Sequence, residues 1–312
     1  MRSALVTGGA GFVGSHLVDA LVARGTRATV LDDLSTGRWE NVTPRATLIV
    51  GSVTDERAVT AALEIAEPDV VFHLAAQIDV RRAVSDPAHD AAVNLIGTVT
   101  VLEAAQRAGV RRFVLASTGG AIYGEAGIVP TPETATPHPG SPYAASKTAA
   151  EVYLDLYREL HGLSSLTLRL ANVYGPRQDP RGEAGVIAIF CAAAAAGMAV
   201  TIYGDGEQTR DFVYVGDVVE AFLAAGATHR CGCCNIATGR ETSVRELARL
   251  LELDAGYAPA RAGEVRRSCL DPAYAAELLG WRPRTALPDG LQWTLTSMAR
   301  ATPRARVASA SP

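Results

Sequence analysis

The chain has 312 residues, of which 48% are hydrophobic and 20% charged, and its formal net charge is −4. A chain of this length and apolar content can bury a sizeable core, in one large α/β domain or in two unequal ones. Basic and acidic residues are mixed along the sequence, without the basic stripe of a nucleic-acid-binding protein. No apolar run approaches the ~18 residues of a membrane span, so we expect neither nucleic acid nor membrane as a partner.

The amino-terminal segment and the cysteines bear on the compartment. Residues 1–6 run straight into a strand-like segment, without the charged and apolar regions of a secretory signal. The five cysteines are Cys191, Cys231, Cys233, Cys234 and Cys269. Three of them are close together, but no second ligand pair follows at the spacing of a structural zinc site. We therefore expect free thiols, no metal ion and a cytoplasmic protein.

In chain order, the first half alternates short β-rich runs with helical stretches. The β-rich runs are almost continuously apolar, which is typical of strands covered on both faces. The expected strands are residues 4–7, 28–31, 47–50, 69–74 and 113–117, and the expected helices between them are residues 14–24, 56–66 and 91–108. This alternation predicts an α/β fold with a doubly wound parallel sheet.

A glycine-rich turn joins the first expected strand to the first helix. Gly8, Gly11 and Gly14 have the spacing G-x-x-G-x-x-G, rather than the G-x-G-x-x-G of the archetypal dinucleotide fingerprint. Glycine allows the tight turn, and it lets backbone N–H groups approach a pyrophosphate at the start of the helix. The turn therefore predicts a dinucleotide site.

Asp32 lies at the end of the second expected strand. A carboxylate there can accept hydrogen bonds from the hydroxyls of an adenosine ribose, and it repels a 2′-phosphate. Asp32 thus favours NAD over NADP. Arg27 and Arg38 are close in the sequence and leave the choice of cofactor open.

Tyr143 and Lys147 lie four residues apart, after a loop of residues 124–142 that is rich in proline and glycine. Ser141 suits the N-cap of a helix and Pro142 its first position. Residues four apart share one helical face, so the lysine ammonium can lie beneath the phenol. A nearby cation has the right sign to lower the phenol pKa from about 10 toward neutrality, which would make Tyr143 a general base.

Ser117 and Thr118 end the fifth expected strand. The carboxyl ends of strands are where a doubly wound sheet binds its ligands. Either hydroxyl can hydrogen-bond the reacting oxygen of a substrate, and the other would then only cap the strand.

In combination these motifs resemble the extended short-chain dehydrogenase/reductases, which have a Rossmann-type fold, and among them the bacterial UDP-glucose 4-epimerases of the NAD-dependent epimerase/dehydratase family. The resemblance runs from the first residue to about residue 293. It is carried by Gly8, Gly11, Gly14, Asp32, His73, Leu74, Ala75, Ala76, Asn94, Ser117, Thr118, Tyr143, Lys147 and the segment Asn-Val-Tyr-Gly-Pro-Arg at residues 172–177. The interval between hydroxyl and tyrosine in that family matches Thr118, so Thr118 is assigned before Ser117.

The resemblance implies a retained NAD and a UDP-sugar that is epimerised at C4 through a transient 4-keto sugar. Thr118, Tyr143 and Lys147 would be the catalytic residues. The implied cofactor contacts are Gly8, Gly11, Phe12, Val13, Gly14, Asp32, Asp33, Ser35, Thr36, Gly37, Ser52, Val53, Leu74, Ala75, Ala76, Asn94, Ser117, Tyr143 and Lys147. The implied substrate contacts are Gln77, Thr118, Tyr143, Asn172, Val186, Tyr203, Arg210, Arg261, Glu264 and Ser268.

Several of these substrate contacts have specific roles by similarity. Asn172, Arg210 and Arg261 would bind the diphosphate, Tyr203 would stack on the uracil, and Glu264 would bind the uridine ribose. The family more often has Asp at this last position, and often also has Asp where this chain has Ser52. Ser268 stands where related epimerases limit the room beside the hexose, and a small residue there would admit an N-acetyl group.

The substrate and the reaction leave alternatives open. UDP-glucose and UDP-galactose are the default pair; UDP-N-acetylhexosamines or uronates such as UDP-glucuronate are the alternatives. A uronate needs a cation near C6, for which the candidates are Arg81, Arg82, Arg177 and Arg181. A 4,6-dehydratase or a decarboxylase would need an acidic residue near Thr118, where Gly119 and Gly120 follow. A non-catalytic NAD sensor would usually have lost Tyr143 or Lys147.

These features predict the following organisation. Residues 1–172 would form the NAD-binding domain, with later segments returning to it, and residues 173–300 a smaller α/β domain that closes over the carboxyl edge of the sheet. Residues 301–312 would be a disordered tail. Helices at residues 91–108 and 143–160 carry more apolar residues than one sheet face needs, which predicts a homodimer.

Overall fold

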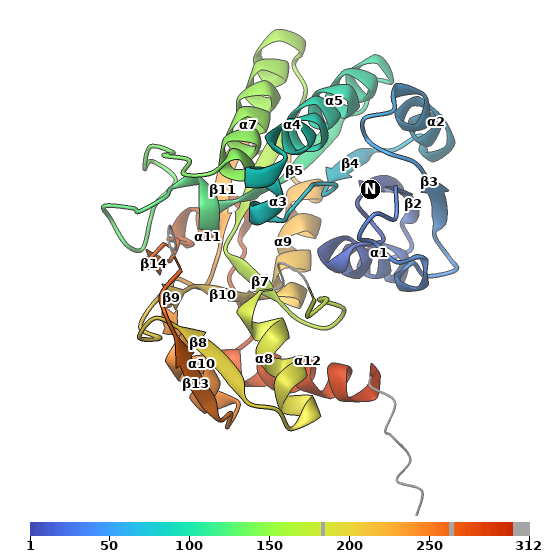
Figure 1. The fold of residues 1–312 in the computed structure, drawn as a ribbon. Helices are drawn as coiled ribbons and strands as arrows, with labels where there is room; N and C mark the ends of the chain where they lie inside the picture. The colour runs from blue at the N-terminus through green and yellow to red at the C-terminus, as the bar shows by residue number, and fades with distance from the viewer. Residues whose placement is uncertain (182–184, 262–264, 302–312) are drawn as a thin grey trace, which may run out of the picture.

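The computed structural model describes residues 1–181, 185–261 and 265–301. Within them, seven parallel strands form the main sheet in the order β11-β6-β5-β4-β1-β2-β3 (Figure 1). The strands are β1 Ser3–Thr7, β2 Arg27–Asp32, β3 Thr47–Val50, β4 Val70–His73, β5 Arg112–Thr118, β6 Ser165–Leu170 and β11 Gly232–Ile236. Thr7 pairs with His73, and Thr118 with Leu170, so the carboxyl ends of neighbouring strands meet at one edge. The predicted doubly wound parallel sheet is confirmed.

Helices cover both faces of this sheet. On one face lie α1 (Phe12–Ala23) and α9 (Val215–Ala227), whose apolar residues form one core with β1, β2 and β4. On the other face lie α2 (Glu56–Ala66), α5 (Gly97–Arg107) and α7 (Pro142–His161) around a second core. Helix α9 and strand β11 follow residue 173, so segments beyond that residue also contribute to the main sheet and to its cover.

The helix expected at residues 91–108 is present, but it is not uniform. Helix α4 (Pro87–Ala91) passes into a π-helical turn at Ala92–Ile96, and α5 then continues to Arg107. The turn buries Asn94, whose amide bonds the backbone of Gln77. Such turns often occur at functional sites. The contacts of Asn94 are tertiary, so helical periodicity could not reveal them.

The start of α7 agrees with the sequence. The Ser141 hydroxyl accepts a hydrogen bond from the backbone N–H of Ala144 at 3.2 Å, and Pro142 occupies the first helical position. The helix ends at Gly162, whose φ of 68° is left-handed. The cap therefore fixes where Tyr143 and Lys147 enter the helix.

The carboxyl-terminal part is richer in strands than we expected from the sequence. The strands β7 Asn172–Tyr174, β8 Val200–Tyr203, β9 Thr209–Arg210, β10 Phe212–Tyr214, β12 Thr242–Ser243, β13 Ala255–Ala258 and β14 Arg267–Ser268 are short and pair in small sheets. Their length explains why hydrophobic alternation did not reveal them. With α8 (Val186–Ala196), α10 (Val244–Leu250) and α12 (Leu287–Ala301) they enclose a third core.

The remaining helices are short. They are α3 Val80–Ser85, α6 Gly119–Ile122, α11 Ala273–Leu279 and the 3₁₀ turn Trp39–Asn41. Because α12 extends through Ala301, that residue belongs to a helix rather than to the expected disordered tail, and residues 302–312 lie outside the described residues. Among the described residues, no helix has the length and apolar character needed to cross a membrane.

Candidate active site

The glycine-rich turn has the geometry of an anion cradle. Gly8 has a φ of 71°, and a Cβ on it would lie 2.6 Å from the backbone nitrogen of Ala75. A Cβ on Gly14 would lie 2.1 Å from the carbonyl oxygen of Gly8. Gly11 is the N-cap of α1 and supplies no side-chain cap, so the first N–H groups of the helix face outward toward an incoming anion. The turn fits the pyrophosphate of a dinucleotide.

Asp32 is buried at the end of β2 and organises the neighbouring loops. Its carboxylate accepts hydrogen bonds from the backbone N–H groups of Ala10 and Leu34, both at 2.9 Å. A Cβ on Gly37 would lie 2.7 Å from Asp32 Oδ1, which explains the glycine there. Burial raises the pKa of Asp32. Each carboxylate oxygen can accept a second hydrogen bond, so a ribose diol fits here.

The two arginines near Asp32 in the sequence are engaged elsewhere. Arg38 forms an ion pair with Asp179 at 2.9 Å. Arg27 begins β2, at the opposite end of the strand from Asp32, and donates to the carbonyl of Ala66. Neither contact places a cation beside the Asp32 carboxylate, where the 2′-phosphate of NADP would need one. The geometry therefore favours NAD over NADP.

The other expected cofactor residues follow the strand ends of the same edge. Ser52 is half-buried after β3 and shares a hydrogen bond of 2.9 Å with the hydroxyl of Thr54. Val53 is buried, and a Cβ on Gly97 would lie 2.7 Å from its Cγ2. After β2 come Asp33, Ser35 and Thr36, which are exposed, and after β4 come Leu74, Ala75 and Ala76, which are half-buried. At the start of α1 lie Phe12 and Val13, also half-buried.

The end of β5 separates the roles of Ser117 and Thr118. Successive side chains of a strand point to opposite faces. The Thr118 side chain is close enough to the phenol of Tyr143 to lower its pKa, whereas the buried Ser117 hydroxyl donates to the carboxylate of Glu151. Of the two hydroxyls, the structure therefore brings Thr118 to the tyrosine and commits Ser117 to a buried carboxylate.

Lys147 is buried one helical turn after Tyr143. Its ammonium donates to the carbonyl of Ala116 at 2.6 Å. Burial lowers the pKa of Lys147 to about 8, while Glu151 and Asp90 oppose that shift. Lys147 is thus held by a backbone carbonyl, and the negative charges of Glu151 and Asp90 favour its ammonium form.

The pKa of Tyr143 lies above its usual value in the protein alone. Burial raises it to about 12, and the charge of Asp90 adds to the increase, whereas the Thr118 side chain lowers it. We expect the Lys147 ammonium and the positive nicotinamide of a bound cofactor to lower this pKa together, and in the protein alone burial has the larger effect. The ammonium is bonded to a backbone carbonyl, and the loss of water around the phenol outweighs other effects.

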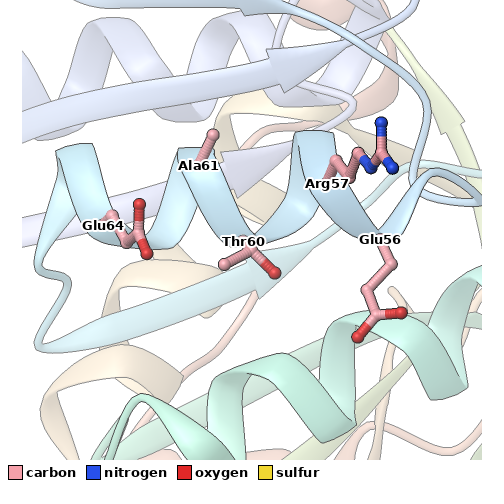
Figure 2. Close-up of a pocket in the computed structure, with 5 residues that line it drawn as sticks. All are labelled: Glu56, Arg57, Thr60, Ala61 and Glu64. Atoms are coloured by element: carbon pink, nitrogen blue, oxygen red, sulfur yellow. The ribbon is translucent and has the colours of Figure 1, made fainter.

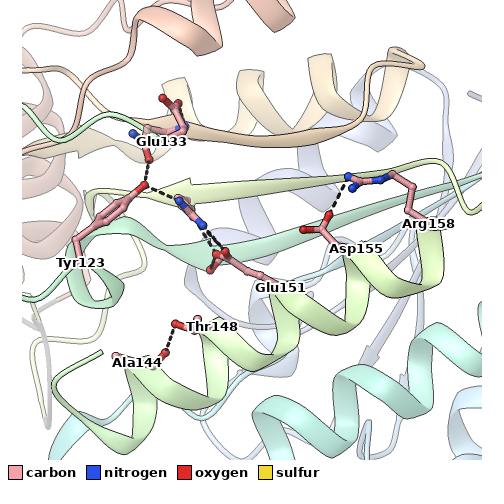
Figure 3. Close-up of polar contacts among 10 residues, drawn as sticks. Tyr123, Glu133, Ala144, Thr148, Glu151, Asp155 and Arg158 are labelled. Carbon is pink, nitrogen blue, oxygen red and sulfur yellow. Dashed lines mark hydrogen bonds and ion pairs between the residues drawn. The ribbon is translucent and has the colours of Figure 1, made fainter. Parts of the chain in front are cut away.

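A buried polar network lies behind the catalytic helix, and the sequence analysis missed it. Glu151 pairs with Arg169 at 2.7 Å, and Arg169 donates to the Tyr123 hydroxyl at 2.6 Å (Figure 3). The Asn235 backbone N–H donates to Glu133, and its amide bonds the carbonyl of Thr131. Glu151 is four residues after Lys147, so helical spacing was a signal that could have revealed it.

A second buried network joins α4, the π-helical turn and α7. Asp90 is 1% exposed. Its Oδ1 accepts from the amides of Gln77 and Asn94 at 2.9 and 3.0 Å, and its Oδ2 accepts from the hydroxyl of Ser146 at 2.6 Å. Gln77 and Asn94 were expected contacts for substrate and cofactor; Asp90 and Ser146 were missed because nothing in their local sequence marks them.

Asn172, Arg210 and Ser268 converge near the end of β5. Ser268 on β14 pairs with Arg210 on β9. A Cβ on Gly120 would lie 3.5 Å from Asn172 Oδ1 and 4.0 Å from Ser268 Oγ. The structure therefore brings these three expected substrate residues together, beside the glycines that follow Thr118.

The expected uracil end is more open. Tyr203 is 36% exposed, and the guanidinium of Arg261 lies 3.9 Å from the centre of its ring. Arg261 covers one ring face, so a base would have to stack on the other face or displace the arginine. Val186 begins α8 and is half-buried. Glu264 lies outside the described residues.

A shallow surface depression lies apart from these residues. It is lined by one face of α2, with Glu56, Arg57, Thr60, Ala61 and Glu64 (Figure 2). Glu56 forms an exposed ion pair with Arg107 at 2.8 Å. The depression contains no expected site residue and has no convergent polar groups, so it is not a candidate for the chemistry.

Comparison with known proteins places this arrangement among characterised enzymes. Residues 4–237 match the model of the NAD dependent epimerase/dehydratase family. A UDP-glucose 4-epimerase of Mycolicibacterium smegmatis is 48% identical over 303 residues, which cover 93% of this chain and 96% of that protein. The structure of a UDP-glucose 4-epimerase with UDP-glucose from Thermotoga maritima has a TM-score of 0.93 at 46% identity, covering 96% of this chain and 99% of that one. For a UDP-glucose 4-epimerase of Thermus thermophilus in complex with NAD the TM-score is 0.90 at 43% identity, with the same coverage.

Proposed function

This chain belongs to the NAD dependent epimerase/dehydratase family, and we propose that it inverts C4 of a UDP-linked hexose, with UDP-glucose and UDP-galactose as its principal pair. It is an NAD-dependent UDP-sugar 4-epimerase, like the relatives it matches over nearly their whole length. The proximity of Thr118, Tyr143 and the buried Lys147 ammonium at the end of β5 is the observation that supports the site most directly. These residues lie at the sheet edge that also carries the dinucleotide turn.

The proposed roles follow from the contacts. The glycine turn and Asp32 would hold NAD, which when bound would supply the hydride chemistry at C4. Tyr143 removes the proton of the 4-hydroxyl as C4 becomes a ketone, and it returns that proton when the other face of the ketone is reduced. Thr118 bonds the same oxygen and orients it. Lys147 contributes positive charge beneath the tyrosine, which favours the phenolate.

The surroundings of Thr118 favour epimerisation over water loss. Dehydration would require an acid and a base beyond the tyrosine, near C5 and C6. Gly119 and Gly120 supply neither, and a Cβ on Gly119 would lie 2.3 Å from Leu270 Cδ1. The space in front of Gly120 instead faces Asn172 and Ser268, the proposed substrate contacts.

A panel of UDP-sugars with NMR detection of the products tests the proposal. We expect UDP-glucose and UDP-galactose to interconvert to the same equilibrium mixture from either side, without added NAD once the enzyme is loaded. A 4-keto-6-deoxy sugar as the main product would identify a dehydratase and overturn the proposal.

A second substrate class has support from Ser268. Its small side chain lies near Gly120 and Asn172, which leaves room for an N-acetyl group. We propose UDP-N-acetylhexosamine as a second substrate. Ser268→Tyr should fill this space and lower kcat/KM for UDP-N-acetylglucosamine, while the glucose reaction survives. An unchanged ratio of the two kcat/KM values would rule out this gate.

The uronate alternative has weaker support. Arg177 pairs with Asp19 at 2.7 Å and Arg181 with Asp179 at 2.9 Å, so two of the four candidate cations are engaged in ion pairs. UDP-glucuronate in the same panel is the check, and we expect slower turnover than for UDP-glucose.

We further propose a cytoplasmic homodimer. On α7, which packs against α5, the side chains of Val152, Leu156 and Leu160 are exposed at intervals of four residues, with Ile96 exposed beside α5. Two copies of such a helix pair could bury these residues in a four-helix bundle. Light scattering at micromolar concentration should give the mass of a dimer. Leu160→Glu should shift the mass toward a monomer, while the exposed Ile65→Glu on α2 should not.

A further inference from the structure

We propose that Asp90 is a positioning residue whose buried negative charge sets the proton affinity of the Tyr143–Lys147 pair. Asp90 has no role in the chemistry proposed above, and it is not among the expected contacts of the cofactor or the substrate. The inference rests on the proposed function of Tyr143 as the proton acceptor, and it deepens that function.

The position of Asp90 is fixed from three sides. Gln77, Asn94 and Ser146 all donate to its carboxylate, at 2.9, 3.0 and 2.6 Å. All three donors are uncharged, and the carboxylate only accepts, which suits its ionised form. The three hydrogen-bond donors thus fix the carboxylate of Asp90 without adding a charge of their own.

Ser146 connects this anion to the catalytic residues. It stands three residues after Tyr143 and directly before Lys147 on α7, and its hydroxyl also lies 3.0 Å from the carbonyl oxygen of Tyr143. A charge at hydrogen-bonding distance from Ser146 acts on both neighbours through a medium of low dielectric constant. The charge of Asp90 raises the pKa of Tyr143 as well as that of Lys147.

The other titratable groups around the pair act differently. Glu151 on α7 raises the pKa of Lys147 but is committed to Arg169 and Ser117. His73 on β4 is buried, and its pKa falls to about 3. Arg81 and Arg82 are exposed on α3, which packs against α7. Of the acidic and basic side chains named here, Asp90 is the one that raises the pKa of both Tyr143 and Lys147.

Asp90→Asn tests the charge, because asparagine keeps the shape and an acceptor oxygen. We expect the ionisation of Tyr143 in the NAD-loaded protein to move to lower pH, by on the order of one pH unit for a single buried charge. Tyrosinate absorbance measures this ionisation, with Tyr143→Phe as the blank. The acid limb of the pH profile of kcat/KM should move in the same direction.

Two further variants make the test independent of folding defects. Asp86→Asn removes an exposed carboxylate from the N-cap of the same helix and should leave the ionisation of Tyr143 unchanged. Ser146→Ala removes one neutral donor but keeps the charge, so the ionisation should stay at or above the wild-type pH. The proposal is overturned if Tyr143 ionises in Asp90→Asn at or above the pH found for the wild type. It is also overturned if Tyr143 ionises at a lower pH in Ser146→Ala than in the wild type. If the wild type converts no UDP-sugar, the proposed function fails, and the absorbance comparison still decides the role of Asp90.

Discussion

The two ends of the candidate site are built differently. At the catalytic end Lys147, Ser117 and Glu151 are buried and hydrogen-bonded, and they lie on long elements of the main sheet and of α7. At the nucleotide end Tyr203 and Arg261 are exposed and lie on or beside the short strands β8 and β13. The first end is preorganised by the fold, whereas the second leaves side chains to be ordered by the substrate.

This difference has an energetic reason. Proton and hydride transfer require reacting groups held to a fraction of an ångström, and buried networks on rigid elements provide that. Charged nucleotides gain affinity from arginines whose donor fork fits a diphosphate, and such contacts tolerate some initial freedom. The comparison therefore predicts that mutations at the catalytic end affect stability and rate, while those at the nucleotide end affect binding.

The largest effect should come from Tyr143→Phe. Loss of the proton acceptor should lower kcat by about 10²–10⁴-fold, with KM for the UDP-sugar nearly unchanged. Thr118→Val should lower kcat less, because this hydroxyl only orients the reacting oxygen. Steady-state kinetics give kcat and KM for both variants. Near-normal turnover of Tyr143→Phe would show that Tyr143 is not the proton acceptor.

Glu151→Ala should have the largest effect on stability. It leaves the buried guanidinium of Arg169 without its partner, which typically costs about 3–5 kcal/mol. Asp155→Ala, one helical turn along, breaks only a surface pair with Arg158 at 2.8 Å (Figure 3) and should cost less than about 1 kcal/mol. Urea unfolding measures both. Equal costs would mean that the Glu151 network is not the preorganised support that we infer.

Asp32→Ala should weaken NAD binding by about 1.5–3 kcal/mol, since charge-assisted hydrogen bonds to the ribose are lost. Asp86→Ala is the control, because Asp86 is exposed, its carboxylate accepts from the backbone N–H of His89 and it is not among the expected cofactor contacts. Calorimetric titration with NAD and NADP gives the affinities. A wild-type preference for NADP would contradict the role of Asp32.

Arg261→Ala tests the open end. We expect the affinity for UDP to fall about tenfold, as for one lost charge-assisted contact, with unfolding free energy unchanged within about 0.5 kcal/mol. Arg249→Ala, another exposed arginine, should change neither quantity. A large loss of stability in Arg261→Ala would show that the nucleotide end is structural too.

The last expected effect is in the pH dependence of stability. His73 is fully buried, and Thr98 donates its hydroxyl proton to the carbonyl of Asn94. Nε2 of His73 must therefore donate to Thr98, while Nδ1 accepts from Thr7. An imidazole with one donor and one acceptor nitrogen is neutral. Burial lowers the pKa of His73 to about 3 from 6.5.

The sign of this dependence follows from proton uptake. Between these two pH values the unfolded chain binds a proton that the folded protein excludes, so stability falls as the pH falls, by at most about 1.4 kcal/mol per pH unit. His73→Gln cannot titrate and should show a shallower slope of urea stability below pH 6.5. Identical slopes would mean that His73 is not held neutral.

Much of the fold and of the chemistry was readable from local sequence. The near-continuous apolar runs predicted the parallel strands, the glycine turn predicted the dinucleotide cradle, and the spacing of Tyr143 and Lys147 predicted one helical face. Each of these features depends on residues within a few positions of one another. Sequence periodicity and backbone sterics therefore determine them before the chain folds.

Other features were decided only when distant segments met. The resemblance already favoured Thr118 over Ser117, but the partners of these two hydroxyls, Tyr143 and Glu151, lie 25 or more residues further along the chain. The π-helical turn around Asn94, the buried carboxylate of Asp90 and the raised pKa of Tyr143 all arise from contacts across elements and from the removal of water. The sequence by itself thus determined the elements and the reacting groups. The tertiary structure decided their protonation and their partners, because burial and long-range hydrogen bonds act only after the segments pack.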